Sequence, residues 1–309
     1  MKIFLAAIES SREHASAAVH AGAQHVLTSF FYAGYLRKTY RDVWLQCLRQ
    51  AGLRLIDSGA FTLRTSVSDL VSTSGSANAE DVDYDAFLAR YIEWLRWLRT
   101  AGLADLWIEL DIAMMASYDW VHRQRDKIIG AGLGAGLVNV WHSDQDWAYW
   151  IELLEECRRP GRSNYVAIEG NQLNRDPLDY TRFLKEAYAR GVRVHAFRMT
   201  SQEAIQKWPF YSVDSSSWIT PTSQGSYVMS TRAGGVVNIR HQGEGLGESM
   251  LRPSWYGIMP RNGTTSRLRV DCLVASARAW IEAERHVTDI WRARGVDWDA
   301  AIANPRMPR

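Results

Sequence analysis

The stretch Phe210-Tyr211-Ser212-Val213-Asp214-Ser215-Ser216-Ser217-Trp218 carries the pattern on which our expectation of the fold depends. It opens with a short β-prone run directly after Trp208-Pro209, a pair that ends the preceding helix. The run ends in a carboxylate, Asp214, followed by three serines. At the carboxyl end of a barrel strand, this aspartate would stand where catalytic groups of that architecture gather. The alternative is an aspartate that caps the next turn.

Acidic residues follow three other strand-like runs in the same way, namely Asp57 after 53–56, Asp111 after 106–110 and Glu169 after 165–168. Because parallel strands of a barrel end at one rim, we expect all four carboxylates to lie together. Like charges in a cleft disfavour one another's ionisation, which is costly. Such a cluster therefore indicates metal binding, proton transfer or attack on an electropositive carbon, and composition alone does not choose between these.

Strand-like and helix-like runs alternate along the first 220 residues. The strand-like runs are 2–8, 25–31, 53–56, 106–110, 137–141, 165–168, 192–197 and 210–214. Helix-like runs between them are 12–21, 41–50, 84–100, 120–129, 146–157, 178–189 and 202–207. Eight strands with intervening helices predict an α/β fold, the (β/α)8 TIM barrel. A doubly wound sheet is the alternative, but no glycine-rich phosphate loop follows the first strand.

The pattern changes after residue 220. Two short runs, 227–231 and 236–240, are separated by Arg232-Ala233-Gly234-Gly235 and predict a β-hairpin. A long C-terminal helix is expected at 267–294. We therefore expect a barrel core over residues 1–220, and over 221–309 a β-hairpin insertion and a C-terminal helical extension packed on the barrel.

Composition and cysteine usage indicate a soluble protein. The chain has 309 residues, of which 47% are hydrophobic and 23% charged, and it contains no apolar run of the roughly 20 residues that span a bilayer. Three scattered cysteines, Cys47, Cys157 and Cys272, match neither a disulfide framework nor a zinc knuckle. We expect a cytoplasmic protein with no membrane partner.

Charge is distributed unevenly between the ends of the chain. Residues 252–309 contain ten arginines and six acidic residues, a net charge of +4, whereas the whole chain has +2. A basic C-terminal region on a near-neutral body indicates contact with phosphates. A solvated helix face with many salt bridges is the alternative.

Three segments resemble the tRNA-guanine transglycosylases. Ile56-Asp57-Ser58-Gly59-Ala60-Phe61 is similar to their Asp-Ser-Gly-Gly motif with its following aromatic residue, and Val213-Asp214 falls where they carry the nucleophile. Gly235-Val236-Val237-Asn238-Ile239-Arg240 resembles their Gly-Pro-Ile-Asn-Ile-Arg stretch, and the order of the segments agrees over roughly residues 2–240. The family's zinc site, three cysteines and a distant histidine, is absent after Arg240. A compact chain without zinc resembles most the phage-type DpdA branch, which exchanges guanine in DNA for a 7-deazaguanine.

The resemblance implies a pentosyltransferase that works through a covalent intermediate. Asp214 would attack C1′ of a guanine nucleotide, and Asp57 would transfer protons as the bases exchange. No cofactor and no metal are implied. The partners would be DNA with its guanine flipped out or single-stranded, and a free 7-deazaguanine base of the preQ0 type. The alternatives are the same chemistry on tRNA, and a metal-dependent or hydrolytic enzyme that uses the same acidic rim.

The resemblance also implies which residues bind the base by its polar edge. Asp111 would accept hydrogen bonds from N1–H and the 2-amino group of a guanine-type base. Its alternative role is the cap of the helix over 118–129. Glu169, or the peptide at Gly170, would contact the amino edge, although the family has Gly-Gly at this point. His142, at the end of 137–141, would bond to the base carbonyl or serve as a structural histidine.

The remaining predicted substrate contacts lie beside the carboxylates. Gly59 permits a tight turn, after which Phe61 would stack on the base, with core packing as its alternative. Phe197 would cover the other face of the base. Ser58 offers a hydroxyl that orients the carboxylates.

Phosphate contacts are expected from arginines of the basic C-terminal region and the hairpin, namely Arg232, Arg240, Arg252, Arg261, Arg267 and Arg269. Fourteen tryptophans fall mostly on helix faces, which indicates core or interface packing and leaves a homodimer as an open alternative.

Overall fold

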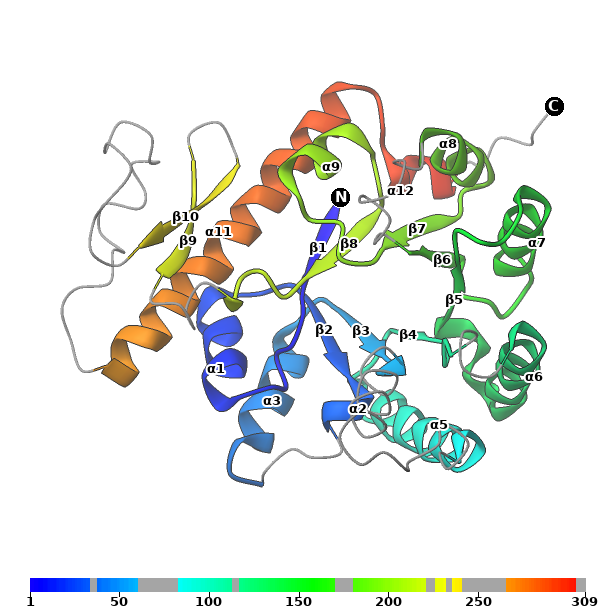
Figure 1. Cartoon of the computed structure of the whole chain (residues 1–309), viewed down its shortest axis with the longest axis horizontal. Helices are drawn as coiled ribbons and strands as arrows, with labels where there is room; N and C mark the ends of the chain where they lie inside the picture. Colours follow the sequence, from blue (N-terminus) through cyan, green and yellow to red (C-terminus); the bar gives the residue numbers. More distant parts are fainter. Residues whose placement is uncertain are drawn as a thin grey trace, which may run out of the picture.

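Eight parallel strands form a closed barrel in the computed structural model (Figure 1). The structure describes residues 1–33, 38–60, 83–112, 117–169, 180–220, 226–231, 235–240 and 265–303. The barrel strands are β1 (Lys2–Leu5), β2 (His25–Ser29), β3 (Leu53–Asp57), β4 (Leu106–Ile108), β5 (Leu137–Trp141), β6 (Tyr165–Ile168), β7 (Arg193–Ala196) and β8 (Ser212–Ser215). Strand β8 pairs with β1 and closes the ring. The predicted (β/α)8 TIM barrel is thus confirmed.

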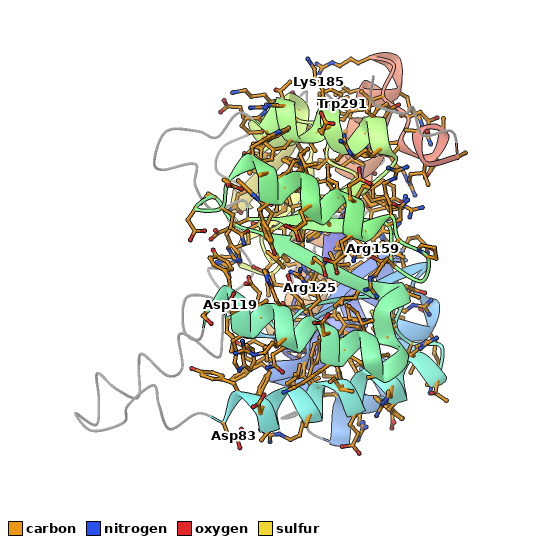
Figure 2. All side chains as sticks on the ribbon, turned by 90° about the vertical axis from the view of Figure 1, so that its right-hand side faces the viewer. Asp83, Asp119, Arg125, Arg159, Lys185 and Trp291 are labelled. Carbon is orange, nitrogen blue, oxygen red and sulfur yellow. The ribbon has the colours of Figure 1, made fainter. Side chains whose placement is uncertain are left out.

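Helices follow the strands in chain order and cover the outside of the barrel (Figure 1). They are α1 (Arg12–Ala21), α2 (Phe30–Ala33), α3 (Lys38–Gln50), α5 (Tyr84–Thr100), α6 (Tyr118–Ile128), α7 (Trp147–Cys157), α8 (Tyr180–Arg190), α9 (Gln202–Lys207), α11 (Thr265–Ala293) and α12 (Trp298–Ala303). Helices α5 to α8 lie side by side along one flank of the molecule (Figure 2).

Local sequence explains where many of these helices begin. A side-chain oxygen at the residue before the helix accepts a hydrogen bond from a backbone N–H of the first turn, which has no partner within the helix. Residues of this kind are Ser11, Asp83, Ser117, Asp146 and Ser201. Helix α1 ends at Gly22, whose φ of 74° is a left-handed conformation that glycine adopts without steric cost.

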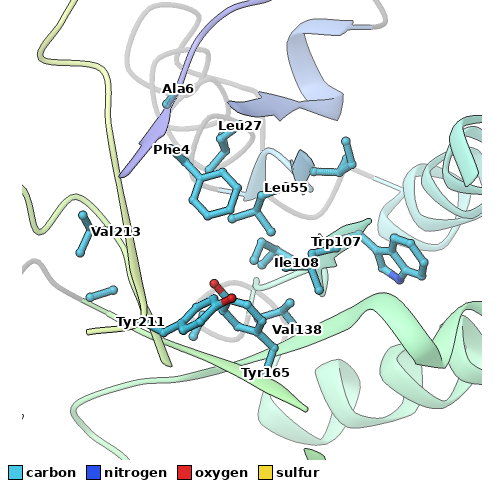
Figure 3. Close-up of a cluster of buried hydrophobic side chains, with 14 of the residues drawn as sticks. Phe4, Ala6, Leu27, Leu55, Trp107, Ile108, Val138, Tyr165, Tyr211 and Val213 are labelled. Carbon is cyan, nitrogen blue, oxygen red and sulfur yellow. The ribbon is translucent and has the colours of Figure 1, made fainter. Parts of the chain in front are cut away.

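Large apolar side chains fill the space inside the ring of strands. Figure 3 shows Phe4, Leu55 and Tyr165 converging there, whereas Trp107 and Val213 point away from it. All five side chains are buried. Because side chains alternate between the two faces of a strand, the outward set packs against the helices and the inward set fills the barrel.

Helix α11 occupies the position of the eighth barrel helix. It packs against α1, β1 and α9, next to the seam between β1 and β8 (Figure 1). The Glu284 carboxylate accepts a hydrogen bond from the Ile3 amide at 2.7 Å and contacts His25 Nδ1 at 2.9 Å. The helix therefore fixes the first two strands at their amino-terminal ends.

The predicted β-hairpin lies between β8 and this last helix. Strands β9 (Ser226–Ser230) and β10 (Val236–Arg240) pair antiparallel, and Val228 and Met229 pack on Cys272 and Ala275 of α11. A Cβ at Gly235 would lie 2.5 Å from the side-chain amide of Gln202, at the start of α9. Gly235, directly before β10, therefore lies beside the loop that follows β7, on the face of the barrel where strands end.

The element bounds differ from expectation in a few places. Strand β1 ends at Leu5 rather than residue 8, because Ala7 adopts a left-handed φ of 63° and turns the chain. The end of the expected strand 25–31 is helical, and α12 was not expected. The three cysteines are unpaired and buried. Within the described part of the chain, no helix has both the length and the apolarity to cross a membrane.

Candidate active site

The strand ends bring the predicted acidic residues to one rim. Asp57 is the last residue of β3, Asp214 lies near the end of β8, and Glu169 directly follows β6. Asp111 lies three residues beyond β4, and His142 directly follows β5. In a (β/α)8 barrel this rim is the face that carries the active site.

Asp57 is held by the backbone of the turn that follows it. The Gly59 amide donates a hydrogen bond to Asp57 Oδ2 at 3.1 Å. Burial raises the pKa of Asp57 from 3.8 to about 6, and the negative charge of Asp214 adds to this rise. The Gly59 amide and the nearby charge of Arg198 act in the opposite direction. Asp214 is therefore close enough for its charge to act on Asp57.

Glycine is required at position 59. Its φ is +82°, and a Cβ there would lie 2.3 Å from Cβ of Phe31. Any larger residue would move the turn that presents Asp57, so the predicted role of Gly59 in a tight turn has a physical basis. Ser58 is fully buried, and its hydroxyl has no hydrogen-bond partner among the described residues.

Asp214 is fixed through one carboxylate oxygen. The Arg198 amide donates to Asp214 Oδ1 at 2.9 Å, and His195 Nε2 lies 3.3 Å from the same oxygen. The residue is 8% exposed. Asp214 does not cap the following turn, because there the Ser217 amide bonds to the Ser215 hydroxyl instead. The structure therefore favours a carboxylate presented to the barrel mouth over the capping role.

His142 joins two of the predicted acidic residues. Its Nε2 lies 2.7 Å from Asp111 Oδ1, and its Nδ1 lies 3.3 Å from Glu169 Oε2. Burial lowers the pKa of His142, but the hydrogen bonds and charges of the two carboxylates outweigh this and raise it to about 10. The imidazole is therefore protonated at neutral pH, and both of its N–H groups are already directed at carboxylates.

Asp111 does not take its alternative role as the cap of α6. The cap of α6 is Ser117, whose hydroxyl accepts a hydrogen bond from the Trp120 amide at 3.2 Å. Asp111 is thus free of helix capping and is held at the rim by His142. A bond from His142 to a base carbonyl would have to replace one of its two carboxylate contacts.

Glu9 is a further buried carboxylic acid close to Asp57, and it was not predicted from the sequence. It lies in the loop after β1, is 2% exposed, and its Oε2 has no hydrogen-bond partner among the described residues. Burial raises the pKa of Glu9 to about 7, contacts with its own backbone, Thr28 and Ser29 lower it, and the Asp57 charge raises it. The signal was present, because Glu9 follows a strand-like run just as Asp57 does.

Arg198 and His195 are the other residues that sequence reasoning missed. Arg198 is exposed and has a left-handed φ of 56°, a conformation that costs energy for a residue with a side chain. This backbone conformation directs its amide at Asp214. His195 is fully buried, and the predicted Phe197 packs edge-on against it, with the ring centroids 5.0 Å apart.

Several predicted contacts cannot be placed. Phe61, Gly170, Arg232, Arg252 and Arg261 lie outside the described residues. Three further arginines are placed by their backbone but not by their side chains, namely Arg240 in β10 and Arg267 and Arg269 at the start of α11.

The comparisons with known proteins identify no family for this chain. A search of protein-family models gives no match, and neither does a search of curated proteins. Within the described part of the chain, no group of three or more His, Cys, Asp and Glu side chains is arranged to hold a metal ion.

Proposed function

We propose that this protein exchanges guanine in DNA for a 7-deazaguanine base through a covalent intermediate on Asp214. The observation that supports this most is the pair of carboxylates at one rim of the barrel, Asp57 at the end of β3 and Asp214 near the end of β8, which lie close enough for the Asp214 charge to raise the pKa of Asp57. One oxygen of each is fixed by a backbone amide. Two carboxylates in these positions suit a double displacement at a sugar carbon.

The first displacement expels guanine. A carboxylate oxygen of Asp214 bonds to C1′ while the bond between C1′ and N9 breaks, and the electron pair leaves with the purine, which takes up a proton. In the second displacement N9 of the 7-deazaguanine bonds to C1′, loses its proton, and the Asp214 carboxylate is released with the electron pair of the ester bond. Two inversions preserve the β configuration.

Asp57 is suited to carry the proton in both steps. It would donate a proton to the departing guanine and then accept one from the incoming base. A residue that must act as acid and then as base works best when its pKa lies near the working pH. Burial and the Asp214 charge bring the pKa of Asp57 to about 6, which leaves both forms populated near neutral pH.

The other side of the mouth offers acceptors for the polar edge of a guanine-type base. Asp111 and Glu169 each accept from His142, which fixes their orientation. A guanine-type base presents N1–H and a 2-amino group, and carboxylate oxygens match these donors. A base without these donors would make fewer hydrogen bonds to the two half-buried carboxylates, which makes the site selective.

Nucleic acid would approach over the same rim. Arg198 is exposed and its backbone amide contacts Asp214, and Gly235, directly before β10, lies next to the start of α9. The Arg198 charge is near enough to act on Asp57, and a cationic group near this carboxylate suits the phosphates that flank the target nucleotide. The base must leave its stack to reach Asp57, so the substrate would be single-stranded or flipped out.

The test is base exchange with DNA and tRNA that carry labelled guanine, each incubated with the protein and a free 7-deazaguanine. We expect release of label from DNA by the wild type and none by Asp214→Asn or Asp57→Asn. Asp126→Asn, on the exposed side of α6, is the matched control and should behave as wild type. Release from tRNA alone would reassign the acceptor, and release from neither would reject the proposal.

A further inference from the structure

A line of buried polar groups leads from the barrel core to Asp214. Tyr165 OH contacts Ser212 Oγ, and Ser212 Oγ lies 2.8 Å from His195 Nδ1. The other ring nitrogen of His195 lies 3.3 Å from Asp214 Oδ1. His195 and Ser212 are completely buried and Tyr165 is 1% exposed, so these contacts are shielded from bulk solvent. Three strands contribute, because β6 carries Tyr165, β7 carries His195, and β8 carries Ser212 and Asp214.

The carboxylate at one end sets the direction of the hydrogen bonds. If His195 carried its hydrogen on Nδ1, its Nε2 lone pair would face a lone pair of Asp214 Oδ1, which is repulsive. If the hydrogen is on Nε2, it lies on the edge of the ring nearest the carboxylate, although Nε2 makes no hydrogen bond among the described residues, and Nδ1 accepts from the Ser212 hydroxyl. Ser212 then accepts from Tyr165, so every hydroxyl donates once. The rings of Phe4 and Phe197, 5.8 and 5.0 Å from the His195 ring, form apolar walls around it.

The distance between Nε2 and Oδ1 is longer than that of a good N–H···O hydrogen bond, which is about 2.9 Å. The two atoms are therefore in electrostatic contact without a hydrogen bond in this structure. Contacts of this kind are commonly long in a site without substrate and shorten when the substrate binds. The Arg198 amide already holds the same oxygen, so the two donors together define one orientation of the carboxylate.

We infer that His195, oriented by Ser212 and Tyr165, is a positioning residue that fixes Asp214 Oδ1 and leaves Oδ2 to attack the sugar. Among the described residues, hydrogen bonds and ion pairs to this carboxylate involve Oδ1 alone. The inference rests on the proposed function, because it assigns a role in the attack of Asp214. The orientation of the imidazole itself does not depend on that reaction.

The two donors also affect the second displacement. A carboxylate oxygen carries more negative charge than the carbonyl oxygen of an ester, so donors to Oδ1 stabilise the free carboxylate relative to the covalent intermediate. Loss of the His195 N–H should therefore slow release of the carboxylate as well as misalign the attack. A larger share of the enzyme should then remain as the covalent intermediate, which a purely structural histidine would not predict.

The first arm of the test examines the imidazole directly. In the full chain labelled with ¹⁵N-histidine, the signals of His195 are identified by their loss in His195→Gln. We expect the hydrogen on Nε2 while Nδ1 accepts from Ser212, and a mixture of the two tautomers in Ser212→Ala. A hydrogen on Nδ1, or a doubly protonated ring, would overturn the inference. This arm requires no enzymatic activity.

The second arm compares base exchange by Ser212→Ala and Tyr165→Phe with that of Tyr188→Phe. Tyr188, near the end of α8, donates its hydroxyl to the Asp297 carbonyl directly before α12 and is the matched control. We expect the first two variants to lose about 10- to 100-fold in turnover with unchanged DNA affinity and a higher share of covalent intermediate. Activity equal to that of Tyr188→Phe would contradict the role of His195. An inactive wild type would reject the proposed function, while the first arm would still decide the orientation.

Discussion

Asp57 is a side chain whose surroundings favour its protonated form. Burial and the Asp214 charge raise its pKa from 3.8 to about 6. The folded state then binds the proton more tightly than the unfolded state does. Between about pH 4 and pH 6 the free energy of unfolding therefore falls as the pH rises, and the loss persists at neutral pH. Residues that lower stability in this way are common in active sites.

Replacement of Asp57 by Asn should stabilise the protein at pH 7 by roughly 1–3 kcal/mol, because the ionisation cost disappears and the amide oxygen still accepts from Gly59. At pH 4 the variant and the wild type should differ little. Urea unfolding at the two pH values measures the difference. A variant that is less stable than the wild type at pH 7 would show that the charge of Asp57 stabilises the fold.

The protonation of His142 affects the pH dependence of the free energy of unfolding in a different way, because its pKa is raised by carboxylates that favour the charged form. Although burial lowers the pKa of its imidazole, Asp111 and Glu169 raise it to about 10, above the ordinary value of 6.5. The stabilisation is fully present below pH 6.5 and is lost as the pH rises towards 10. Wild type should lose roughly 2–4 kcal/mol more than His142→Gln between pH 6.5 and pH 9, measured by urea unfolding. Parallel curves for the two proteins would indicate that the imidazole is neutral.

Part of the candidate site was predictable from the sequence, because its carboxylates share one feature: each comes at the end of a strand-like run. Asp57, Asp111, Glu169 and Asp214 each follow a strand-like run, and parallel strands end at the same rim. Glu9 obeys the same rule, but its strand ends early at Leu5, so a turn separates it from the strand. The contacts of His142 could not be predicted, because they depend on how three adjacent strand ends are spaced.

At the scale of elements, strands and helices were predicted well where periodicity was strong. The bounds of α1 and α5 match expectation, since apolar spacing and a capping residue mark them. Short elements such as α2 and α12 carry too few residues to show a period. His195 was not recognised because it is internal to a strand, and only the barrel interior reveals which of its neighbours it meets.

A buried ion pair joins β4 to α6. Arg125, labelled in Figure 2, donates to Glu109 through Nε at 2.8 Å and through a terminal nitrogen at 3.0 Å. Glu109 Oε1 also accepts from the Val140 amide of β5. Glu109 is 1% exposed and Arg125 is 5% exposed, so the Glu109 charge depends on Arg125 for compensation, whereas Arg125 also pairs with Glu156 at 3.4 Å.

Replacement of Arg125 by Met should lower the free energy of unfolding by roughly 3–5 kcal/mol, because the Glu109 charge would remain buried without a cation. Addition of Glu109→Gln to that variant should recover much of the loss, since the amide oxygen keeps its bond to Val140. Chemical denaturation of both variants measures this. Equal stability of the single and double variants would show that the charge on Glu109 is not the cause.

At the scale of the whole molecule, the position of α11 determines which pieces of the chain can fold. The chain leaves the barrel after β8, forms the hairpin, and returns as the helix that covers the seam between β8 and β1. The expected division at residue 220 separates the barrel strands from that helix. Such a division was predictable from the change of pattern, but the return of the helix to the first strand was not.

A chain that ends at residue 220 should therefore fail to fold into a stable barrel. It would expose the apolar surface that α11 covers and leave the Ile3 amide without Glu284. A chain that ends at Ala303, after α12, is the control and should unfold cooperatively. Thermal unfolding followed by circular dichroism measures both. Cooperative unfolding of the shorter chain would show that the first 220 residues form an independent domain.

The central claim is a covalent bond between Asp214 and a sugar. The most direct measurement is the intact mass of the protein after incubation with guanine-containing single-stranded DNA, followed by mapping of the modified peptide. We predict an adduct on the peptide that contains Asp214, with one guanine released for each adduct, and none in Asp214→Asn. Guanine release by folded protein without any adduct, or an adduct on another residue, would contradict the account.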